Sequence, residues 1–96
     1  MIITQVVFHL SEPISLQAAT EIFESTAPGY RGHPGLRRKY YIRSDDGLRV
    51  GGLYFWESRR HARETYSDAW RAMVTEKYGA APEISYFDAP VMVDNS

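Results

Sequence analysis

The chain has 96 residues, no cysteine and a formal net charge of -1 at pH 7. Because domains run from about 50 to 250 residues, this length predicts one domain over residues 1–96 with a single hydrophobic core. The near-neutral charge argues against a nucleic-acid partner, and the lack of cysteine excludes disulfides, thiol catalysis and iron–sulfur ligation.

The N-terminal residues have neither the basic leader nor the long apolar region of a signal peptide. No apolar run approaches the roughly 20 residues that a membrane helix needs. The sequence therefore predicts a cytoplasmic protein with no membrane partner.

The first part of the chain predicts a strand, a helix and a second strand. Residues 2–10 mix β-branched and aromatic side chains in a pattern typical of a strand that is partly buried on both faces. Helix-start residues from Ser11 onward and an apolar helical face predict a helix that ends near Thr26. Pro28-Gly29 stops this helix, and residues 36–43 predict the second strand.

Asp45-Asp46-Gly47 predicts the loop of a β-hairpin, because a three-residue loop with glycine in the left-handed position is a favoured connection. The third strand then covers residues 48–56. In this register one face carries Arg38, Tyr40, Ile42, Val50, Gly52, Tyr54 and Trp56, and the other carries Lys39, Tyr41, Arg43, Leu53 and Phe55. A two-residue turn would reassign the faces. Gly51-Gly52 indicates a bulge, a close approach of another backbone or a ligand, or a simple twist.

The last part of the chain predicts a two-part helix and a final strand. Ser58 is placed to cap the first part, and Ser67 or Asp68 the second. Gly79 followed by Pro82 ends the helix. The last strand covers residues 83–87 and resumes near Val91, and Pro90 places it at a sheet edge because proline cannot donate to the ladder.

This order of elements predicts an α+β fold. It is the ferredoxin-like β-α-β-β-α-β arrangement, an antiparallel sheet of order 4-1-3-2 with the helices on one face. The chain shows no internal repeat, linker or low-complexity segment.

Aromatic residues make up 14% of the chain, which is high for a small domain. One interpretation is core and dimer packing, because rings supply large contact areas. The other is a pocket for a small apolar or aromatic ligand, formed by rings with a few hydroxyl and indole donors. The candidate ligand-binding rings are Tyr40, Tyr54, Trp56, Tyr66 and Trp70. Arg38, on the predicted face of Tyr54, is a candidate for stabilising a phenolate or enolate.

The histidines show no metal-ligand spacing, so we expect no metal site. His9, at the end of the first strand, and His33, in a Gly-Pro loop, are candidates for the mouth of a pocket. His61, among arginines, is expected to be a solvated surface residue. No nucleophile elbow, P-loop or dinucleotide fingerprint is present.

Several segments carry a family resemblance. They are Gly51-Gly52-Leu53-Tyr54-Phe55-Trp56-Glu57-Ser58, Trp70, Tyr86-Phe87-Asp88-Ala89-Pro90-Val91, Pro34-Gly35-Leu36 and Lys77-Tyr78-Gly79. On these segments the chain resembles small monooxygenase-like proteins of the dimeric α/β-barrel superfamily, the antibiotic-biosynthesis-monooxygenase type and within it the YdhR-like branch.

The resemblance implies a homodimer whose two sheets face each other as a barrel, with one cavity per protomer between sheet and helices. Relatives of this type oxidise phenolic rings with molecular oxygen and without metal or flavin, so no cofactor is expected. Their Asn, Trp, Tyr and Arg site residues cannot be aligned here, where the only asparagine is Asn95.

Three functions remain open. The first is a cofactor-independent monooxygenase of a small aromatic or phenolic molecule, with Tyr54 and Trp56 lining the cavity, Tyr66 or Trp70 closing it, and His9 or His33 assisting deprotonation. The second is a non-catalytic ligand-binding or accessory dimer, since fold does not imply function. The third is an isomerase or lyase that uses His9, His33 or Glu57 as its acid or base.

Overall fold

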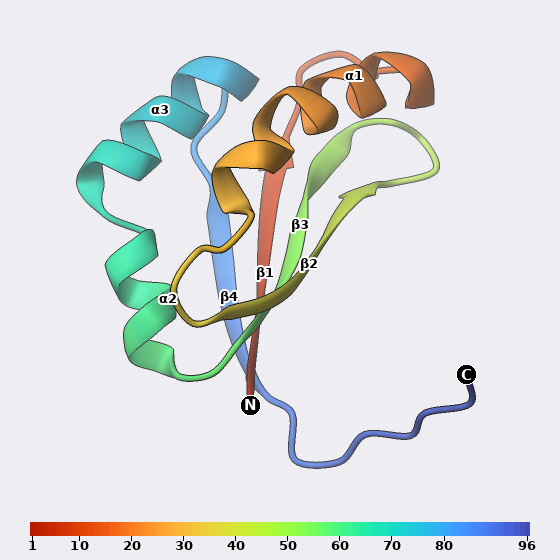
Figure 1. The fold of residues 1–96 in the computed structure, drawn as a ribbon. Coiled ribbons are helices and arrows are strands. Elements are labelled where there is room, and N and C mark those ends of the chain that lie inside the picture. Colours follow the sequence, from red (N-terminus) through yellow and green to blue (C-terminus); the bar gives the residue numbers. More distant parts are fainter.

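The computed structural model describes all of residues 1–96. Its elements are β1 (Ile2–His9), α1 (Leu16–Thr26), the 3-10 helix η1 (Ala27–Tyr30), β2 (Leu36–Arg43), β3 (Arg49–Trp56), α2 (Arg59–Thr65), α3 (Asp68–Tyr78) and β4 (Glu83–Asp88). The four strands form one antiparallel sheet of order β2-β3-β1-β4. Figure 1 shows the helices on one side of this sheet. The predicted α+β class, element order and strand order are confirmed.

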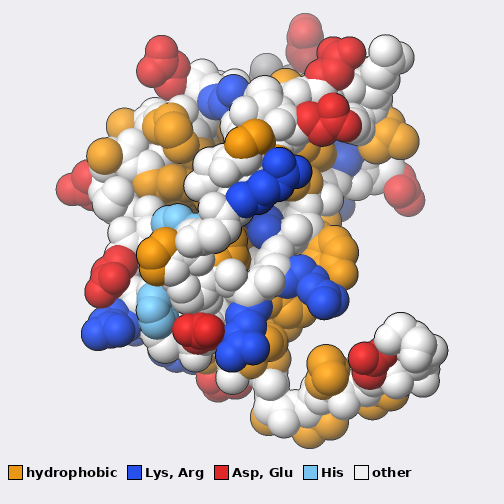
Figure 2. All heavy atoms as spheres, viewed as in Figure 1, with side chains coloured by type: hydrophobic (Ala, Val, Ile, Leu, Met, Phe, Trp, Pro, Cys, Tyr) orange, Lys and Arg blue, Asp and Glu red, His pale blue; other side chains and the backbone are white.

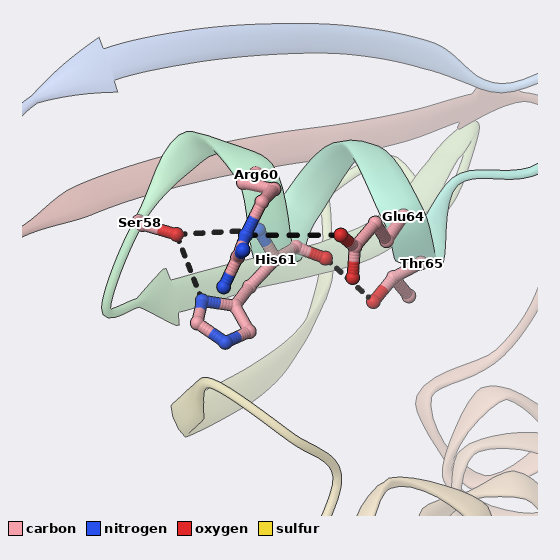
Figure 3. A network of polar contacts seen from close by, with 5 residues as sticks. All are labelled: Ser58, Arg60, His61, Glu64 and Thr65. Atoms are coloured by element: carbon pink, nitrogen blue, oxygen red, sulfur yellow. Dashed lines mark hydrogen bonds and ion pairs between the residues drawn. The ribbon is translucent and has the colours of Figure 1, made fainter.

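Serine side chains begin all three α-helices. The hydroxyl oxygens of Ser15, Ser58 and Ser67 each accept a hydrogen bond from a backbone N–H of the first helical turn. Such a cap contributes about 1 kcal/mol. Figure 3 shows the cap at Ser58, whose Oγ also lies 2.8 Å from Nδ1 of His61. The predicted break between two helices is therefore confirmed, with Ser67 as the second cap.

The hairpin between β2 and β3 differs from the prediction by one residue. Arg43 pairs with Val50, and the Ser44 N–H donates to the carbonyl oxygen of Arg49. The loop between Ser44 and Arg49 therefore has four residues, 45–48. Side chains stabilise this longer loop: Oδ1 of Asp46 accepts from the Leu48 N–H, and Oγ of Ser44 accepts from the Arg49 N–H. Because side chains alternate along a strand, one extra residue reverses the faces.

The predicted assignment of faces is consequently wrong. Lys39 pairs with Tyr54 and shares its helix-covered face, and Tyr41 pairs with Gly52 on that face. Arg38 pairs with Phe55 on the opposite face of the sheet. The cation beside Tyr54 is therefore Lys39, and the expectation that Arg38 lies there is corrected.

The sheet has one irregularity of register and one glycine required by close packing. The register of β2 shifts between Leu36 and Arg38, so the bulge lies there rather than at Gly51-Gly52. Gly51 is required for a different reason, because a Cβ at this position would collide with the backbone carbonyl of Val6. Of the three predicted explanations for the paired glycines, close approach of another backbone is the one observed at Gly51.

The core lies between the sheet and the helices. Its buried members are Val6, Phe8, Ala19, Phe23, Val50, Tyr54, Trp56, Ala62, Tyr66, Trp70 and Val74. The opposite face of the sheet carries no helix (Figure 1). It presents partly or largely exposed apolar side chains, among them Phe55, Phe87 and Tyr40.

Strand β4 lies at the sheet edge, as predicted, but it ends at Asp88 and does not resume at Val91. Beyond it the chain runs away from the domain (Figure 1) with Val91, Met92 and Val93 about four-fifths exposed. Figure 2 shows hydrophobic side chains along this tail. No helix has the length and apolar character to cross a membrane.

Candidate functional site

A cavity of about 490 Å³ opens between the sheet and the helices. Strands β2 and β3 form its floor, and α1, η1 and α3 form its walls. Its lining residues are Phe8, Ser25, Thr26, Gly29, Tyr30, His33, Lys39, Tyr41, Gly51, Tyr54, Thr65, Trp70, Met73, Val74, Lys77 and Tyr78. This volume lies within the range of about 300–1,000 Å³ typical of small-molecule sites.

Hydrogen bonds between elements hold the cavity rings in place. The indole N–H of Trp70 on α3 donates to the hydroxyl of Tyr30 on η1 across 2.9 Å. The hydroxyl of Tyr41 on β2 lies 2.7 Å from Oγ1 of Thr26 at the end of α1. Because each bond joins two elements, the rings are fixed with little freedom to collapse into the cavity.

Lys39 is the most unusual residue of the cavity. Its Nζ lies 3.5 Å from the ring centroid of Tyr30, 3.9 Å from that of Tyr41 and 4.5 Å from that of Tyr54. Ring faces attract an ammonium group. Burial acts in the opposite direction and lowers the pKa of Lys39 to about 7, because an ammonium loses hydration away from water.

No acidic side chain lines the cavity, which contains Lys39, Lys77 and His33 as its cationic or titratable nitrogen groups. The four ion pairs of the molecule lie elsewhere and do not involve Lys39. Lys39 is partly buried, and an amine removed from water to this extent is commonly paired with a carboxylate. The cavity therefore offers Lys39 no acidic side chain as a partner, and an acidic ligand would supply one.

Burial disfavours ionisation of three tyrosine hydroxyls of the cavity, those of Tyr41, Tyr54 and Tyr78. Burial raises the pKa of Tyr54 far above its ordinary value and raises that of Tyr78 to about 12. Burial also raises the pKa of Tyr41, although the hydrogen bond with Thr26 opposes this shift. The Tyr41 hydroxyl donates its hydrogen to Thr26, whose own hydroxyl donates to the Phe23 carbonyl oxygen. The hydroxyls of Tyr54 and Tyr78 can donate hydrogen bonds to a ligand, but they are poor proton acceptors near pH 7.

His33 lies at the cavity, half-buried, with Nε2 2.6 Å from Oγ1 of Thr65. The Thr65 hydroxyl donates its only hydrogen to the carbonyl oxygen of His61, as Figure 3 shows. The Thr65 oxygen must therefore accept a hydrogen bond from Nε2 of His33. Nε2 carries a hydrogen, and in the neutral ring Nδ1 is then the acceptor nitrogen.

The structure brings three predicted site residues to the cavity wall: His33, Tyr54 and Trp70. His9 lies elsewhere, exposed at the end of β1, with Nε2 3.6 Å from a Glu83 carboxylate oxygen. Tyr40 projects on the face without helices and is about half exposed, next to Arg38. The expectation that Tyr40 and Arg38 face the sheet-helix cavity is corrected by the four-residue hairpin loop.

Trp56 and Tyr66 lie beside the cavity rather than at its wall. Trp56 is fully buried, and its indole N–H donates to Oγ1 of Thr4 across 2.9 Å. The Tyr66 hydroxyl lies 2.6 Å from the same oxygen. Trp56 stacks on Tyr54, and Tyr66 packs on Trp70, so both rings support cavity residues from behind.

His61 is also placed differently from the expectation of a solvated residue. It is half-buried, and its ring lies directly over Gly35, where a Cβ would collide with it. Gly35 also has φ +76°, so two constraints require glycine at this position. His61 packs α2 against the loop before β2.

Sequence reasoning missed Lys39, Tyr41 and Tyr30 as cavity residues. The first two were assigned to the other face through the hairpin register. The signal that would have placed them is the loop chemistry, because Ser44 and Asp46 are residues whose side chains bond to nearby backbone groups and lengthen turns. The 3-10 helix that positions Tyr30 has no clear periodicity in four residues.

Three solved structures show how widely this fold is shared. A monooxygenase from the ActVA-Orf6 gene of Streptomyces coelicolor, in complex with nanaomycin D, matches 99% of this chain and 92% of its own, with 20% identity and a TM-score of 0.73. SnoaB, a cofactor-independent oxygenase of Streptomyces nogalater, matches 96% of this chain and 95% of its own, with 16% identity and a TM-score of 0.68. Rv0793 of Mycobacterium tuberculosis matches the full length of both chains, with 16% identity and a TM-score of 0.65.

No protein-family model matches the sequence, and no curated protein matches it. The structural matches define the class by fold: the chain has the ferredoxin-like architecture of antibiotic-biosynthesis-monooxygenase-type proteins. They do not single out the YdhR-like branch within that class.

Proposed function

We propose that the protein is a cofactor-independent monooxygenase that acts on a small aromatic or phenolic molecule in the cavity between its sheet and helices. The observation that carries this proposal is the cavity of about 490 Å³, walled by tyrosine and tryptophan rings. The fold adds support, because it is shared over nearly the whole chain with SnoaB and the ActVA-Orf6 monooxygenase.

Within this proposal the rings of Tyr54 and Trp70 contact the substrate, and His33 lies at the cavity with its Nε2 bonded to Thr65. Trp56 and Tyr66 take a supporting role, because their polar atoms are already bonded to Thr4. Flat substrates fit such a site, since aromatic pairs stack with centroids about 4.5–7 Å apart.

The reaction that fits is oxidation of a phenol to a quinone with the substrate as the electron source. For 1-naphthol, one molecule reacts with one O₂ to give 1,4-naphthoquinone and one water. One oxygen atom enters the ring at the carbon that loses hydrogen, and the other leaves as water. The substrate gives up four electrons and O₂ accepts four, so no external reductant is needed.

Oxygen consumption tests this function. We expect the protein to accelerate O₂ uptake by polycyclic phenols such as 1-naphthol, with one O₂ consumed per quinone formed. Argon should abolish the turnover, and an ¹⁸O₂ atmosphere should label the new carbonyl. Saturable phenol binding without accelerated uptake would contradict the oxygenase and favour a non-catalytic binding dimer, whereas turnover that persists under argon would favour an isomerase.

We also propose that the protein works as a homodimer through the sheet face that carries no helix. Phe87 and Tyr40 on this face are each 49% exposed, and Phe55 is partly exposed between them in the sheet order. A second copy would cover this apolar surface. Light scattering should give twice the mass of the chain, and Phe55→Asp should halve it without changing the far-UV spectrum; a monomeric wild-type chain would contradict the proposal.

A further inference from the structure

The cavity holds a lysine that no ion pair of the fold explains. Lys39 adds no ion pair to the fold, and its Nζ contacts the rings of Tyr30, Tyr41 and Tyr54 instead of a carboxylate. A methionine of similar length would fill the same space without the cost of desolvating an amine. The amine is therefore better explained by something that enters the cavity.

We propose that Lys39 is the base of this cavity, which accepts the proton of a weakly acidic aromatic hydroxyl and then holds the resulting anion as its counter-ion. This inference rests on the proposed use of the cavity as a ligand site. It assigns to Lys39 the role that the sequence had suggested for His9 or His33, and it defines the ligand class as phenols and enols.

The proton step is simple and balanced. The O–H bond of the ligand breaks, its electron pair stays on the ligand oxygen, and the proton forms a new N–H bond at Nζ of Lys39. No electron is exchanged. The ammonium that results is stabilised by the three ring faces and by the phenolate, so the complex contains a paired charge where the free cavity has an unpaired amine.

The groups around Lys39 favour this direction of transfer. They are Tyr30 on η1, Tyr41 on β2, Tyr54 on β3, Lys77 and Tyr78 on α3, and His33 on the loop before β2. None is a carboxylate that would compete for the ammonium, and burial raises the pKa of Tyr41, Tyr54 and Tyr78. The positive charge of Lys77 at the same cavity further favours an anionic ligand.

The pH dependence of binding follows from counting protons. The complex holds one proton, shared between the ligand oxygen and Lys39. Below pH 7 the free amine is protonated as well as the ligand, so binding must release a proton and weakens by about tenfold per pH unit. Above the pKa of the ligand both free partners lack the proton, so binding must take one up and weakens again.

4-Nitrophenol is a suitable probe, because its anion is yellow, its neutral form is nearly colourless and its pKa lies near that of Lys39. Titration of the full chain under argon at pH 6 should turn the bound probe yellow, although the free probe at that pH is mostly neutral. Affinity should peak near pH 7. The methyl ether 4-nitroanisole, which has no proton to give, should bind without a colour change.

Three variants separate the roles of Lys39. Lys39→Met should leave the bound probe colourless, weaken binding at pH 7 roughly tenfold to a hundredfold and remove the loss of affinity below pH 7. Lys39→Arg is always charged and cannot accept the proton, so it should still bind the yellow anion but lose the decline at high pH. Arg38→Met, on the face of the sheet without helices, is the matched control outside the cavity and should keep the colour at pH 6.

A colourless bound probe in the wild-type chain, or a yellow one in Lys39→Met, would overturn the inference. These outcomes are independent of oxygenation because oxygen is excluded. A yellow, Lys39-dependent complex with no O₂ uptake in air would retain the inference and contradict the oxygenase. O₂ uptake by phenols that is unchanged in Lys39→Met would retain the oxygenase and contradict the inference.

Discussion

The two ends of the aromatic layer under the helices are built from similar rings but satisfy their polar atoms differently. At the closed end, Thr4 bonds both the Trp56 indole and the Tyr66 hydroxyl, and no water or ligand is needed. At the open end, Nζ of Lys39 lies against the ring faces of Tyr30, Tyr41 and Tyr54 and takes part in no ion pair.

This difference shows what identifies a site in an aromatic-rich domain. Rings occur at both ends, so ring clustering alone does not separate core from cavity. The separating feature is a polar group without a polar partner, because such a group is costly in a core and is retained where a ligand can complete it. The following predictions test the contrast between the closed and open ends, from the largest effect to the smallest.

Removal of the central ring of the closed end should have the largest effect on stability. Trp56→Ala deletes a fully buried side chain and leaves Thr4 with one partner fewer, so the free energy of unfolding should fall by about 3–5 kcal/mol. Urea denaturation measures the loss. Leu16→Ala on exposed α1 is the matched control, expected to change stability by less than about 1 kcal/mol. A small effect of Trp56→Ala would mean that the closed end is not the core.

At the open end, the effect of Lys39 on stability should depend on pH. The folded-state pKa of Lys39 is lowered to about 7, so between pH 7 and about 10 the unfolded chain binds more protons than the folded one. Stability should therefore rise with pH in this window, by at most about 1.4 kcal/mol per unit. In Lys39→Met this rise should vanish and stability at pH 6 should increase by about 2–4 kcal/mol.

Urea unfolding at pH 6, 7, 8 and 9 measures this slope, and Lys77→Met serves as the control that keeps it. Above about pH 10 stability should fall with rising pH in the wild type and in the Lys77→Met control. Burial raises the pKa of Tyr54, Tyr66 and Tyr78, so only the unfolded chain then loses those protons. Equal slopes in the wild type and in Lys39→Met would show that burial does not lower the pKa of Lys39.

A smaller effect is expected from the hydroxyl of Thr4. Thr4→Val keeps the shape of the side chain but leaves the Trp56 N–H without an acceptor, at a cost of about 1–3 kcal/mol. Thr4→Ser keeps the hydroxyl and loses only a methyl group, so it should cost less than Thr4→Val. Thermal and urea unfolding of the two variants give the comparison, and the reverse order would show that packing outweighs the hydrogen bonds here.

The smallest effect is expected from the neighbour of Lys39 on the other side of the sheet. Arg38 is exposed and lies on the face without helices. Arg38→Met should change stability by no more than about 0.5 kcal/mol and should leave the colour of bound 4-nitrophenol unchanged. A loss of the colour in Arg38→Met would restore the register in which Arg38 faces the cavity.

The order of elements and the sheet topology were accessible from the sequence because they depend on periodicity and on strong boundary residues. Ser58, Ser67 and Gly79 each fixed a helix end through local chemistry. The register of the β2–β3 hairpin is harder to predict, because the only local signal for a four-residue loop is that Asp46 and Ser44 can bond nearby backbone groups.

The one-residue difference in the length of this loop changes which residues line the candidate site. Sequence reasoning found Tyr54, Trp70 and His33 at the cavity, because rings and a loop histidine are recognisable by type. The predicted register placed Arg38, and not Lys39, beside Tyr54. Because side chains alternate along a strand, a register error of one residue reverses the faces. The desolvation of Lys39 depends on packing of η1, β2 and β3 together and has no signature in the local sequence.

The central claim is that Lys39 is a partly buried amine whose pKa is lowered to about 7, and direct titration of that amine tests it. NMR of protein carrying ¹³C-labelled lysine follows the Cε signals of Lys39 and Lys77, the only other lysine, across pH, with Lys39→Met assigning the resonance. We predict that Lys39 titrates near pH 7. A Lys39 signal that titrates near its ordinary value of about 10.4 would contradict the account.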